Sequence, residues 1–234
     1  MTYILNKYIA KDNNYEPAIK DSSILSKESL EDYIINQLSY YYNKSVTELK
    51  EAFHIKYSIS NKAFTYYLAK AMLNVSNERI EEFEKANIKI KAIRLQANGM
   101  PKESMSFPSF KYTEIIKQNW EDSELYNIFT ETKYLFMIYQ YTHENTLIFK
   151  KAMFWNVPMK DIDTEIKRVW KETIKRIKAN RYNDLPHATE SPILHVRPHA
   201  RNALDTYPTP DGKSAVKKCF WFNREYIKKQ IEEN

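Results

Sequence analysis

The sequence predicts a mixed α/β fold in which helices come first and strands alternate with helices afterwards. Apolar side chains recur at helical spacing over residues 26–72, and strand-like alternation begins at residue 88. The chain has 234 residues, of which 43% are hydrophobic, so it can bury a sizeable core. We expect a single domain over 1–234, with a mainly helical lobe at 1–87 and a mixed sheet flanked by helices at 88–234.

The helical lobe is expected to contain three helices, each introduced by residues that cap helix N-termini. Ser26–Ser29 and Ser60–Asn61 precede the first and the third, and Ser45 with Glu48 forms a capping box for the second. Tyrosines are frequent in this lobe and could stack on nucleic-acid bases. Packing in a core or an interface is the commoner use of tyrosine at these spacings.

The remaining elements follow from the spacing of apolar residues and from turn signals. Residues 97–131 are expected to be irregular with one short helix near 112–119, and residues 142–146 to form a polar hairpin connection. Strands and helices are otherwise expected as follows: strands at 88–96, 133–141, 147–155, 193–198 and 218–222, and helices at 158–178 and from Asn223 onward.

Composition excludes several classes of function. Gly99 and Gly212 are the only glycines, which excludes a glycine-rich phosphate loop and a dinucleotide fingerprint. Cys219 is the only cysteine, which leaves no disulfide and no cysteine-based zinc site and favours the cytoplasm. The sequence has no long apolar run, so neither secretion nor a membrane span is expected.

Positive charge is concentrated near the end of the sequence. Residues 195–230 contain eight Lys or Arg residues and three acidic residues, a balance of +5 in a chain whose net charge is +6. This concentration favours a polyanionic partner such as a nucleic acid.

The strand expected from residue 88 carries two lysines on one face. Lys89 and Lys91 alternate with apolar residues, so both ammonium groups leave the same side of the strand. Divalent-metal phosphodiesterases commonly need an acid before such a strand, then a carboxylate and a lysine at alternate positions on it. Here Lys89 stands where the carboxylate is expected. The pattern favours a strand that touches a nucleic-acid backbone without cutting it, and an ordinary solvated strand face is the alternative.

A second cluster of polar residues closes the strand expected at 193–198. That strand ends in Arg197-Pro198-His199, where the proline stops strand pairing, and Arg201 and Asn202 follow on the emerging loop. Arginine can bind guanine edges bidentately and asparagine can bind adenine, while histidine and further arginines can take phosphates. A polar strand end with ordinary loop charges is the alternative.

Four segments match one protein family in order: Lys102–Phe107, Trp120–Glu124, His195–His199 and Phe220–Ile231. On these residues the chain resembles the carboxyl-terminal half of staphylococcal-type type II restriction endonucleases, which cut DNA at GATC and are related to the mismatch-repair nickase MutH. The similarity covers nearly the whole chain, including the opening Met1–Tyr8. Each motif is weak by itself, but the four together are specific.

The resemblance implies a MutH-like, restriction-endonuclease-like fold with a central mixed sheet flanked by helices. It also implies an enzyme of two such domains: an amino-terminal catalytic domain that uses Mg²⁺, and a carboxyl-terminal domain that binds GATC as an allosteric effector. By position, Glu82 takes the place of the first acid, Lys89 that of the metal-binding glutamate, and Lys91 that of the lysine. Because a cation at Lys89 should abolish Mg²⁺ binding, we expect no catalytic residue and no cofactor in this domain.

The same resemblance implies the DNA-binding residues and the partners. Arg197 and His199 match an Arg-Pro-basic motif that contacts the recognition sequence, and Trp221 lies in an aromatic strand near DNA. The expected partners are GATC-containing duplex DNA and the catalytic amino-terminal domain of the same enzyme. With the basic residues nearby, the expected DNA-binding set is Lys89, Lys91, Arg197, His199, Arg201, Asn202, Lys217, Lys218 and Trp221.

Two other functions stay open. Glu131 and Lys133 form a Glu-x-Lys triplet that is expected to enter a strand, with Asp122 and Glu124 upstream, so an active Mg²⁺-dependent nuclease is the second hypothesis. A protein-binding module built on the tyrosine-rich helices is the third. It leaves the basic carboxyl-terminal region unexplained.

Overall fold

The computed structural model describes residues 14–61 and 63–233, which group into two compact units. The first unit comprises the described part of Met1–Ala97 together with Lys133–Trp155. The second comprises Asn98–Thr132 together with the described part of Asn156–Asn234. The opening Met1–Tyr8, which contributed to the family resemblance, lies outside the described residues. The single domain expected over 1–234 stays a prediction.

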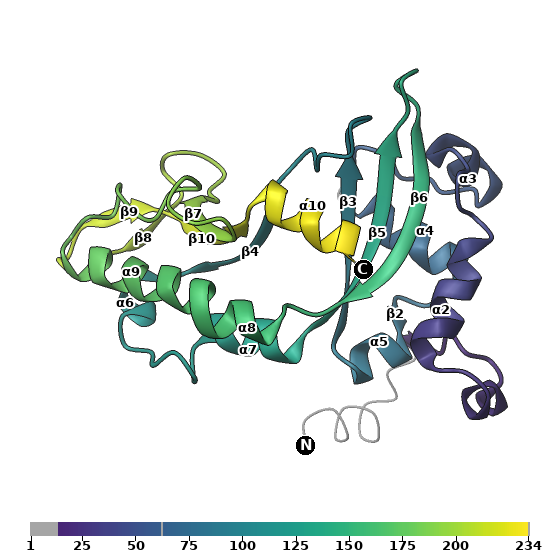
Figure 1. Ribbon diagram of the computed structural model, residues 1–234, viewed down its shortest axis with the longest axis horizontal. Coiled ribbons are helices and arrows are strands. Elements are labelled where there is room, and N and C mark those ends of the chain that lie inside the picture. Colours follow the sequence, from purple (N-terminus) through teal and green to yellow (C-terminus); the bar gives the residue numbers. More distant parts are fainter. Residues whose placement is uncertain (1–13, 62, 234) are drawn as a thin grey trace. The chain divides into compact units, whose positions relative to one another are not determined.

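The first unit is built on a mixed three-stranded sheet in the order β3-β5-β6, shown in Figure 1. Strand β3 (Ile88–Leu95) runs parallel to β5 (Lys133–Tyr141), and β5 runs antiparallel to β6 (Leu147–Trp155). The three strands predicted for this region are confirmed, because alternation of apolar and polar residues is a direct signal of a strand. β3 is an edge strand of this sheet.

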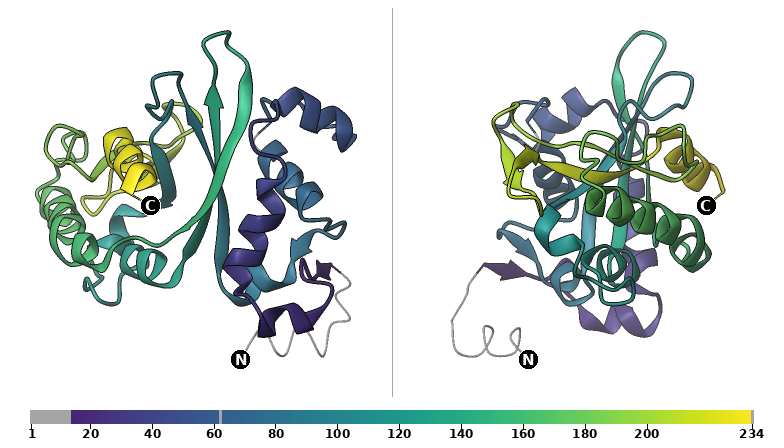
Figure 2. Two further views of the ribbon diagram at one scale, coloured as in Figure 1. Left: turned by 45° about the vertical axis from the view of Figure 1, so that its right-hand side comes forward. Right: turned by 90° about the vertical axis from the view of Figure 1, so that its left-hand side faces the viewer.

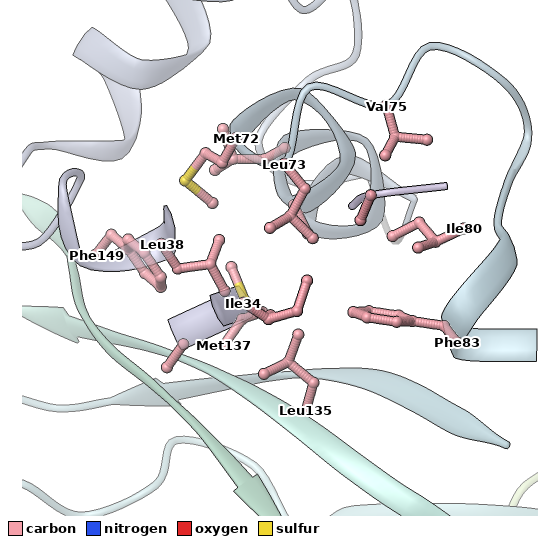
Figure 3. Close-up of a cluster of buried hydrophobic side chains, with 14 of the residues drawn as sticks. Ile34, Leu38, Met72, Leu73, Val75, Ile80, Phe83, Leu135, Met137 and Phe149 are labelled. Atoms are coloured by element: carbon pink, nitrogen blue, oxygen red, sulfur yellow. The ribbon is translucent and has the colours of Figure 1, made fainter. Parts of the chain in front are cut away.

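Helices cover one face of this sheet, as Figure 2 shows. The capping box of Ser45 and Glu48 is present, and the three predicted helices are confirmed. Between helices and sheet lies a core to which α2 contributes Leu38 and β5 contributes Leu135 and Met137 (Figure 3). The helices are α2 (Leu30–Ser39), α3 (Val46–Ala52) and α4 (Phe64–Met72), and the short elements are β1 (Tyr15–Glu16), η1 (Ser22–Ser26), β2 (Arg79–Ile80) and α5 (Glu81–Lys85).

The second unit contains an antiparallel sheet in the order β4-β10-β7. Its central strand β10 (Lys218–Phe222) and its edge strand β7 (Leu194–Pro198) match the prediction. The other edge strand, β4 (Met105–Phe110), corrects the expectation that residues 97–131 are irregular. Pro108 hides this strand from a sequence pattern, because proline lacks an N–H donor and is tolerated only at a sheet edge. A hairpin of β8 (Thr206–Pro208) and β9 (Ser214–Val216) was also not expected.

Helices of the second unit differ in part from those expected. The helix near 112–119 shortens to α6 (Tyr112–Ile115), and α7 (Glu124–Glu131) was not expected. α7 is held by Phe129, whose ring stacks on Phe222 of β10 at a centroid distance of 5.1 Å. The helix expected at 158–178 is present in three consecutive parts: α8 (Met159–Asp161), a π-helical turn (Ile162–Ile166) and α9 (Lys167–Lys178). The last predicted helix is confirmed as α10 (Arg224–Glu233).

The mixed class of helices and strands is confirmed, but the strands are divided differently from the expectation. Within residues 14–61 and 63–233 they form two three-stranded and two two-stranded sheets in place of one central sheet. No helix in this part of the chain is both long enough and apolar enough to span a membrane.

Candidate nucleic-acid interface

Arg197 and Trp221 meet on one face of the sheet in the second unit. In the register of β7 and β10, Arg197 lies opposite Cys219 and His195 lies opposite Trp221. Arg197 and Trp221 are therefore diagonal neighbours, close enough for long side chains to touch. The guanidinium carbon of Arg197 lies 3.9 Å from the centroid of the Trp221 ring. This contact places the guanidinium over the indole ring.

His199 contacts the same tryptophan from the end of β7. Its ring meets Trp221 edge to face with centroids 5.3 Å apart, and its Nδ1 lies 3.3 Å from the Oγ of Ser109 in β4. Ser109 was not expected here, because β4 gave no strand signal in the sequence. Arg197, His199, Trp221 and Ser109 are called the Arg197 cluster below.

Arg197 differs from most basic side chains of its segment in having no acidic partner. It is exposed, and no carboxylate pairs with it among the residues that the structure describes. Four lysines of the same segment each face a carboxylate: Lys213 and Asp211, Lys217 and Asp205, Lys228 and Glu232, Lys229 and Glu233. The positive charge that remains available to a polyanion therefore lies largely on arginines, among them Arg197.

The structure corrects the expectation that Lys218 follows a DNA backbone, whereas the same expectation for Lys217 stays a prediction. Lys218 is buried, and its Nζ donates a hydrogen bond of 2.6 Å to the carbonyl oxygen of Tyr182. Burial of this ammonium group away from water lowers its pKa. Lys217 is half-buried, pairs with Asp205 and lies 4.6 Å from the centroid of the Tyr207 ring. Lys218 therefore serves the fold of this unit, and the charge of Lys217 is partly offset by Asp205.

Arg201 and Asn202 lie exposed on the loop between β7 and β8. The Oδ1 of Asn202 accepts a hydrogen bond of 2.9 Å from the backbone N–H of Leu204, so this oxygen already shapes the loop. The backbone N–H of Arg201 donates to Oδ2 of Asp205 at 3.1 Å, while its side chain remains exposed. Of the two, Arg201 is better placed to meet an external partner.

His195 lies buried behind the exposed end of β7. Its Nδ1 is 2.5 Å from Oδ1 of Asn223, and Nδ2 of Asn223 donates to the carbonyl oxygen of Ser191 at 2.7 Å. Burial is the main cause of the lowered pKa of His195, which favours the neutral ring. Cys219 is fully buried, in line with the expected role of a small core residue. Neither side chain is placed to meet a ligand.

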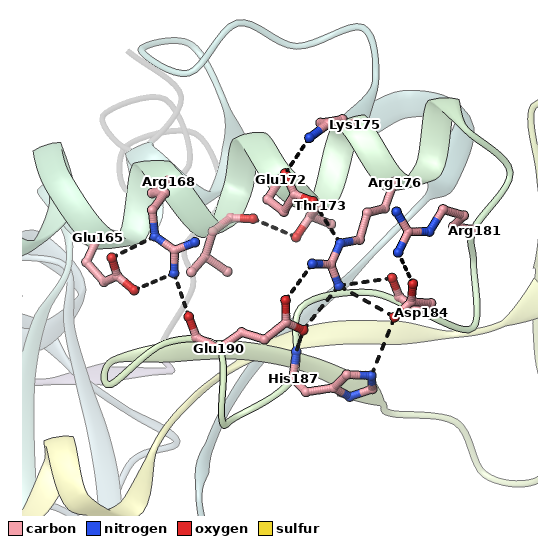
Figure 4. Close-up of polar contacts among 11 residues, drawn as sticks. Glu165, Arg168, Glu172, Thr173, Lys175, Arg176, Arg181, Asp184, His187 and Glu190 are labelled. Carbon is pink, nitrogen blue, oxygen red and sulfur yellow. Dashed lines mark hydrogen bonds and ion pairs between the residues drawn. The ribbon is translucent and has the colours of Figure 1, made fainter.

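A network of charges holds the segment that leads into β7 (Figure 4). Arg176 of α9 donates two parallel hydrogen bonds to the carboxylate of Glu190, at 3.1 and 2.5 Å, and one of 2.9 Å to Glu172. Farther along, the backbone N–H of Val196 in β7 donates to the carbonyl oxygen of Pro186 at 2.8 Å. Arg176 thereby holds residues 184–190, which precede β7 and accept a hydrogen bond from it.

The two lysines of the first unit lie on β3 as predicted. Ile88 and Ile90 face the core beneath the helices, so Lys89 and Lys91 lie on the opposite face of the strand. Lys89 is exposed, and Lys91 is half-buried. Both ammonium groups are attached to the same edge strand, two residues apart.

Glu82, the residue expected in place of a first metal-binding acid, lies in α5 and binds backbone. One carboxylate oxygen accepts a hydrogen bond of 2.9 Å from the N–H of Ala18, and the other accepts one of 3.1 Å from Ile19. Magnesium prefers several oxygen ligands in octahedral geometry. The carboxylate of Glu82 already accepts two backbone hydrogen bonds, and Lys89 and Lys91 are cations, so these three residues do not form a magnesium site.

The structure also corrects the expected geometry of Glu131 and Lys133. Glu131 is the last residue of helix α7 and does not enter a strand. Lys133 is the first residue of β5, and its ammonium group pairs with Glu31 of α2. A nuclease site with carboxylate and lysine at alternate positions of one strand is therefore not formed here.

Comparison with known proteins bears on the family to which the chain is related. Residues 72–169 match the family model described as DNA mismatch repair enzyme MutH. The type II restriction enzyme Sau3AI of Staphylococcus aureus is 31% identical over 282 aligned positions, which cover all of this chain. The chain spans 57% of the length of that relative. These matches confirm the resemblance that the four sequence motifs indicated: the chain carries a MutH-like restriction-endonuclease domain.

Proposed function

We propose that this domain binds duplex DNA at GATC through the Arg197 cluster and does not cut it. The observation that carries the proposal is the exposed guanidinium of Arg197, which lies 3.9 Å from the Trp221 ring and has no carboxylate partner in the described chain. A planar guanidinium matches the two acceptors, O6 and N7, that guanine presents in the major groove. GATC offers one such guanine on each strand.

The other members of the cluster complete a surface for DNA. Ser109 contacts Nδ1 of His199 and so orients the ring, which leaves Nε2 available to a base edge or a phosphate. Trp221 holds both side chains in place. Arg201, exposed on the following loop, is suited to a phosphate contact. Because these groups are positioned before DNA arrives, little side-chain entropy is lost on binding.

The proposed lack of cleavage rests on Glu82, Lys89 and Lys91. The carboxylate of Glu82 is held by two backbone N–H groups, and the two lysines present cations where a metal-dependent nuclease needs anionic ligands. An ammonium group repels Mg²⁺ and attracts a phosphate. We assign Lys89 and Lys91 to contacts with the DNA backbone.

A catalytic domain in a longer enzyme is the partner that we propose for this one. The chain matches 57% of the length of its restriction-enzyme relative, which leaves room for a second domain in a protein of that size. GATC binding here would favour the arrangement in which the amino-terminal catalytic domain is competent. Such coupling requires that the DNA-bound domain differ in affinity between two arrangements.

Fluorescence anisotropy with labelled duplexes tests the proposed specificity. We expect a change of one of the two guanine–cytosine pairs in GATC to weaken binding by about 5- to 150-fold, the usual cost of one mismatched base pair. The comparison is made at one fixed salt concentration, because phosphate contacts make every DNA affinity salt-dependent. Equal affinities for GATC, the changed site and a scrambled duplex would rule the proposal out.

Replacing Arg201 with glutamine is expected to lower the salt dependence of DNA binding. Loss of one phosphate contact reduces the slope of log affinity against log salt by about 0.9. Lys213→Gln is the matched control, because Lys213 lies in the same segment and faces Asp211 at 3.4 Å. A slope that Arg201→Gln leaves at the wild-type value removes Arg201 from the phosphate contacts.

A further inference from the structure

Leu204 is unusually exposed for a large apolar side chain. Its exposed fraction is 89%, the highest among the large hydrophobic residues in the described ranges. It lies in the loop of residues 199–205 between β7 and β8, two residues after Asn202. One exposed leucine needs no explanation by itself. The surroundings of Leu204, however, indicate a role for its exposed side chain.

Hydrogen bonds hold the loop around Leu204 in a fixed form. Oδ1 of Asn202 accepts from the N–H of Leu204 at 2.9 Å, and Oδ2 of Asp205 accepts from the N–H of Arg201 at 3.1 Å. The carbonyl oxygen of Asp205 accepts from the N–H of Lys217 at 3.1 Å, and the two side chains form an ion pair. The leucine is therefore presented on an ordered loop, and binding through it costs little conformational entropy.

The same hydrogen bonds place Leu204 near the Arg197 cluster. The carbonyl oxygen of Lys217 accepts from the N–H of His199 at 2.9 Å, while its N–H donates to Asp205. Asp205 is thus two hydrogen-bonded spacings from His199, or about 10 Å at ~4.8 Å for each spacing. Successive bases on a DNA strand are about 3.4 Å apart along the axis. Leu204 is the neighbour of Asp205 in the chain and therefore lies within about 14 Å, or about four base steps, of His199.

We propose that Leu204 contacts the C5-methyl group of thymine in the GATC site, an inference that rests on the proposed function. Thymine is the base that presents a methyl group in the major groove, and apolar side chains recognise it there. Each strand of GATC has one thymine, two steps from its guanine, and this spacing lies within the reach of Leu204 from the Arg197 cluster. Arg197 then identifies the guanine by hydrogen bonds, and Leu204 identifies the thymine by an apolar contact.

Replacing thymine by deoxyuridine removes this methyl group and nothing else. We expect the wild-type domain to bind a GATC duplex with deoxyuridine in both strands about fourfold more weakly, the loss for one buried methyl group. Both strands carry the change, because the site is palindromic and the domain could otherwise bind the unmodified strand. The Leu204→Ala variant should bind the thymine and deoxyuridine duplexes equally. Leu25→Ala is the matched control, because Leu25 is also an exposed leucine, 49% accessible, but lies in η1 of the first unit. This control should keep the fourfold difference.

The outcomes separate the two proposals. If Leu204→Ala weakens both duplexes by one common factor and keeps the fourfold difference, Leu204 does not contact the methyl group. A wild-type domain that prefers GATC over a single-base-pair change but ignores the methyl group also overturns the contact, and leaves the proposed function standing. If the wild-type domain shows no preference for GATC, both the proposed function and the proposed methyl contact are contradicted.

Discussion

Replacing Arg197 with alanine should weaken binding to a GATC duplex by about 1–3 kcal/mol, or roughly 5- to 150-fold, and narrow the gap to non-cognate DNA. The guanidinium of Arg197 is exposed, oriented over Trp221 at 3.9 Å, and not paired with a carboxylate in the described residues. Its loss removes two donors that match one guanine, whereas the phosphate contacts remain. Anisotropy titrations with cognate and scrambled duplexes measure both affinities.

Two variants separate base recognition by Arg197 from its charge. Arg197→Lys keeps the positive charge but loses the planar pair of donors, so it should retain affinity for scrambled DNA and lose most of the preference for GATC. Lys229→Ala is the control for charge in the same segment, since Lys229 is exposed and faces Glu233 at 3.7 Å. Discrimination that survives Arg197→Ala would show that this arginine does not recognise a base.

Replacing Arg176 with alanine should lower the free energy of unfolding by about 3 kcal/mol. The Arg176 side chain is 10% exposed and binds Glu172, Glu190 and the carbonyl oxygen of Asp184 (Figure 4). Its removal leaves partly buried carboxylates without their cation. Lys175→Ala is the control on the same helix, because its 77% exposed side chain forms a surface pair that should contribute less than about 1 kcal/mol. Urea unfolding compares the two, and equal losses would contradict a special role for Arg176.

The same network should make stability depend on pH in the acid range. The bonds from Arg176, followed by the backbone N–H of His187, lower the pKa of Glu190 from 4.5 to about 2. A carboxyl group whose pKa is lower in the folded state stabilises the fold fully above the higher value and loses this effect as pH falls toward the lower one. Unfolding followed from pH 5 to 2 should therefore show a decrease that Glu190→Gln reduces. The side chain of Glu190 is 34% exposed, so solvent moderates the effect.

Much of the fold could be predicted because its signals are local. Lys89 and Lys91 alternate with core isoleucines on β3, and Ser45 with Glu48 begins α3 as a capping box. Strand β4 could not be predicted, because Pro108 interrupts the pattern and only the pairing with β10 reveals an edge strand. Helix α7 is short and depends on the packing of Phe129 against Phe222, which are far apart in the sequence.

The candidate site was predicted in part. Arg197 and His199 were chosen from a local motif, but their contact with Trp221 depends on the register between β7 and β10. Lys217 and Lys218 look alike in sequence, yet alternation along β10 places Lys218 on the face of Phe220 and Phe222, where it is buried. The hydrogen bonds of Glu82 to residues 18 and 19 join segments that are distant in the sequence.

Incubating this domain with an end-labelled GATC duplex and Mg²⁺, and scoring bound and cleaved DNA in the same samples, tests the proposed function most directly. We expect a retained complex with both strands intact, and the same result for Glu131→Gln. Mg²⁺-dependent cleavage at GATC by the wild-type domain, abolished by Glu131→Gln, would contradict a domain that binds this sequence without cutting it.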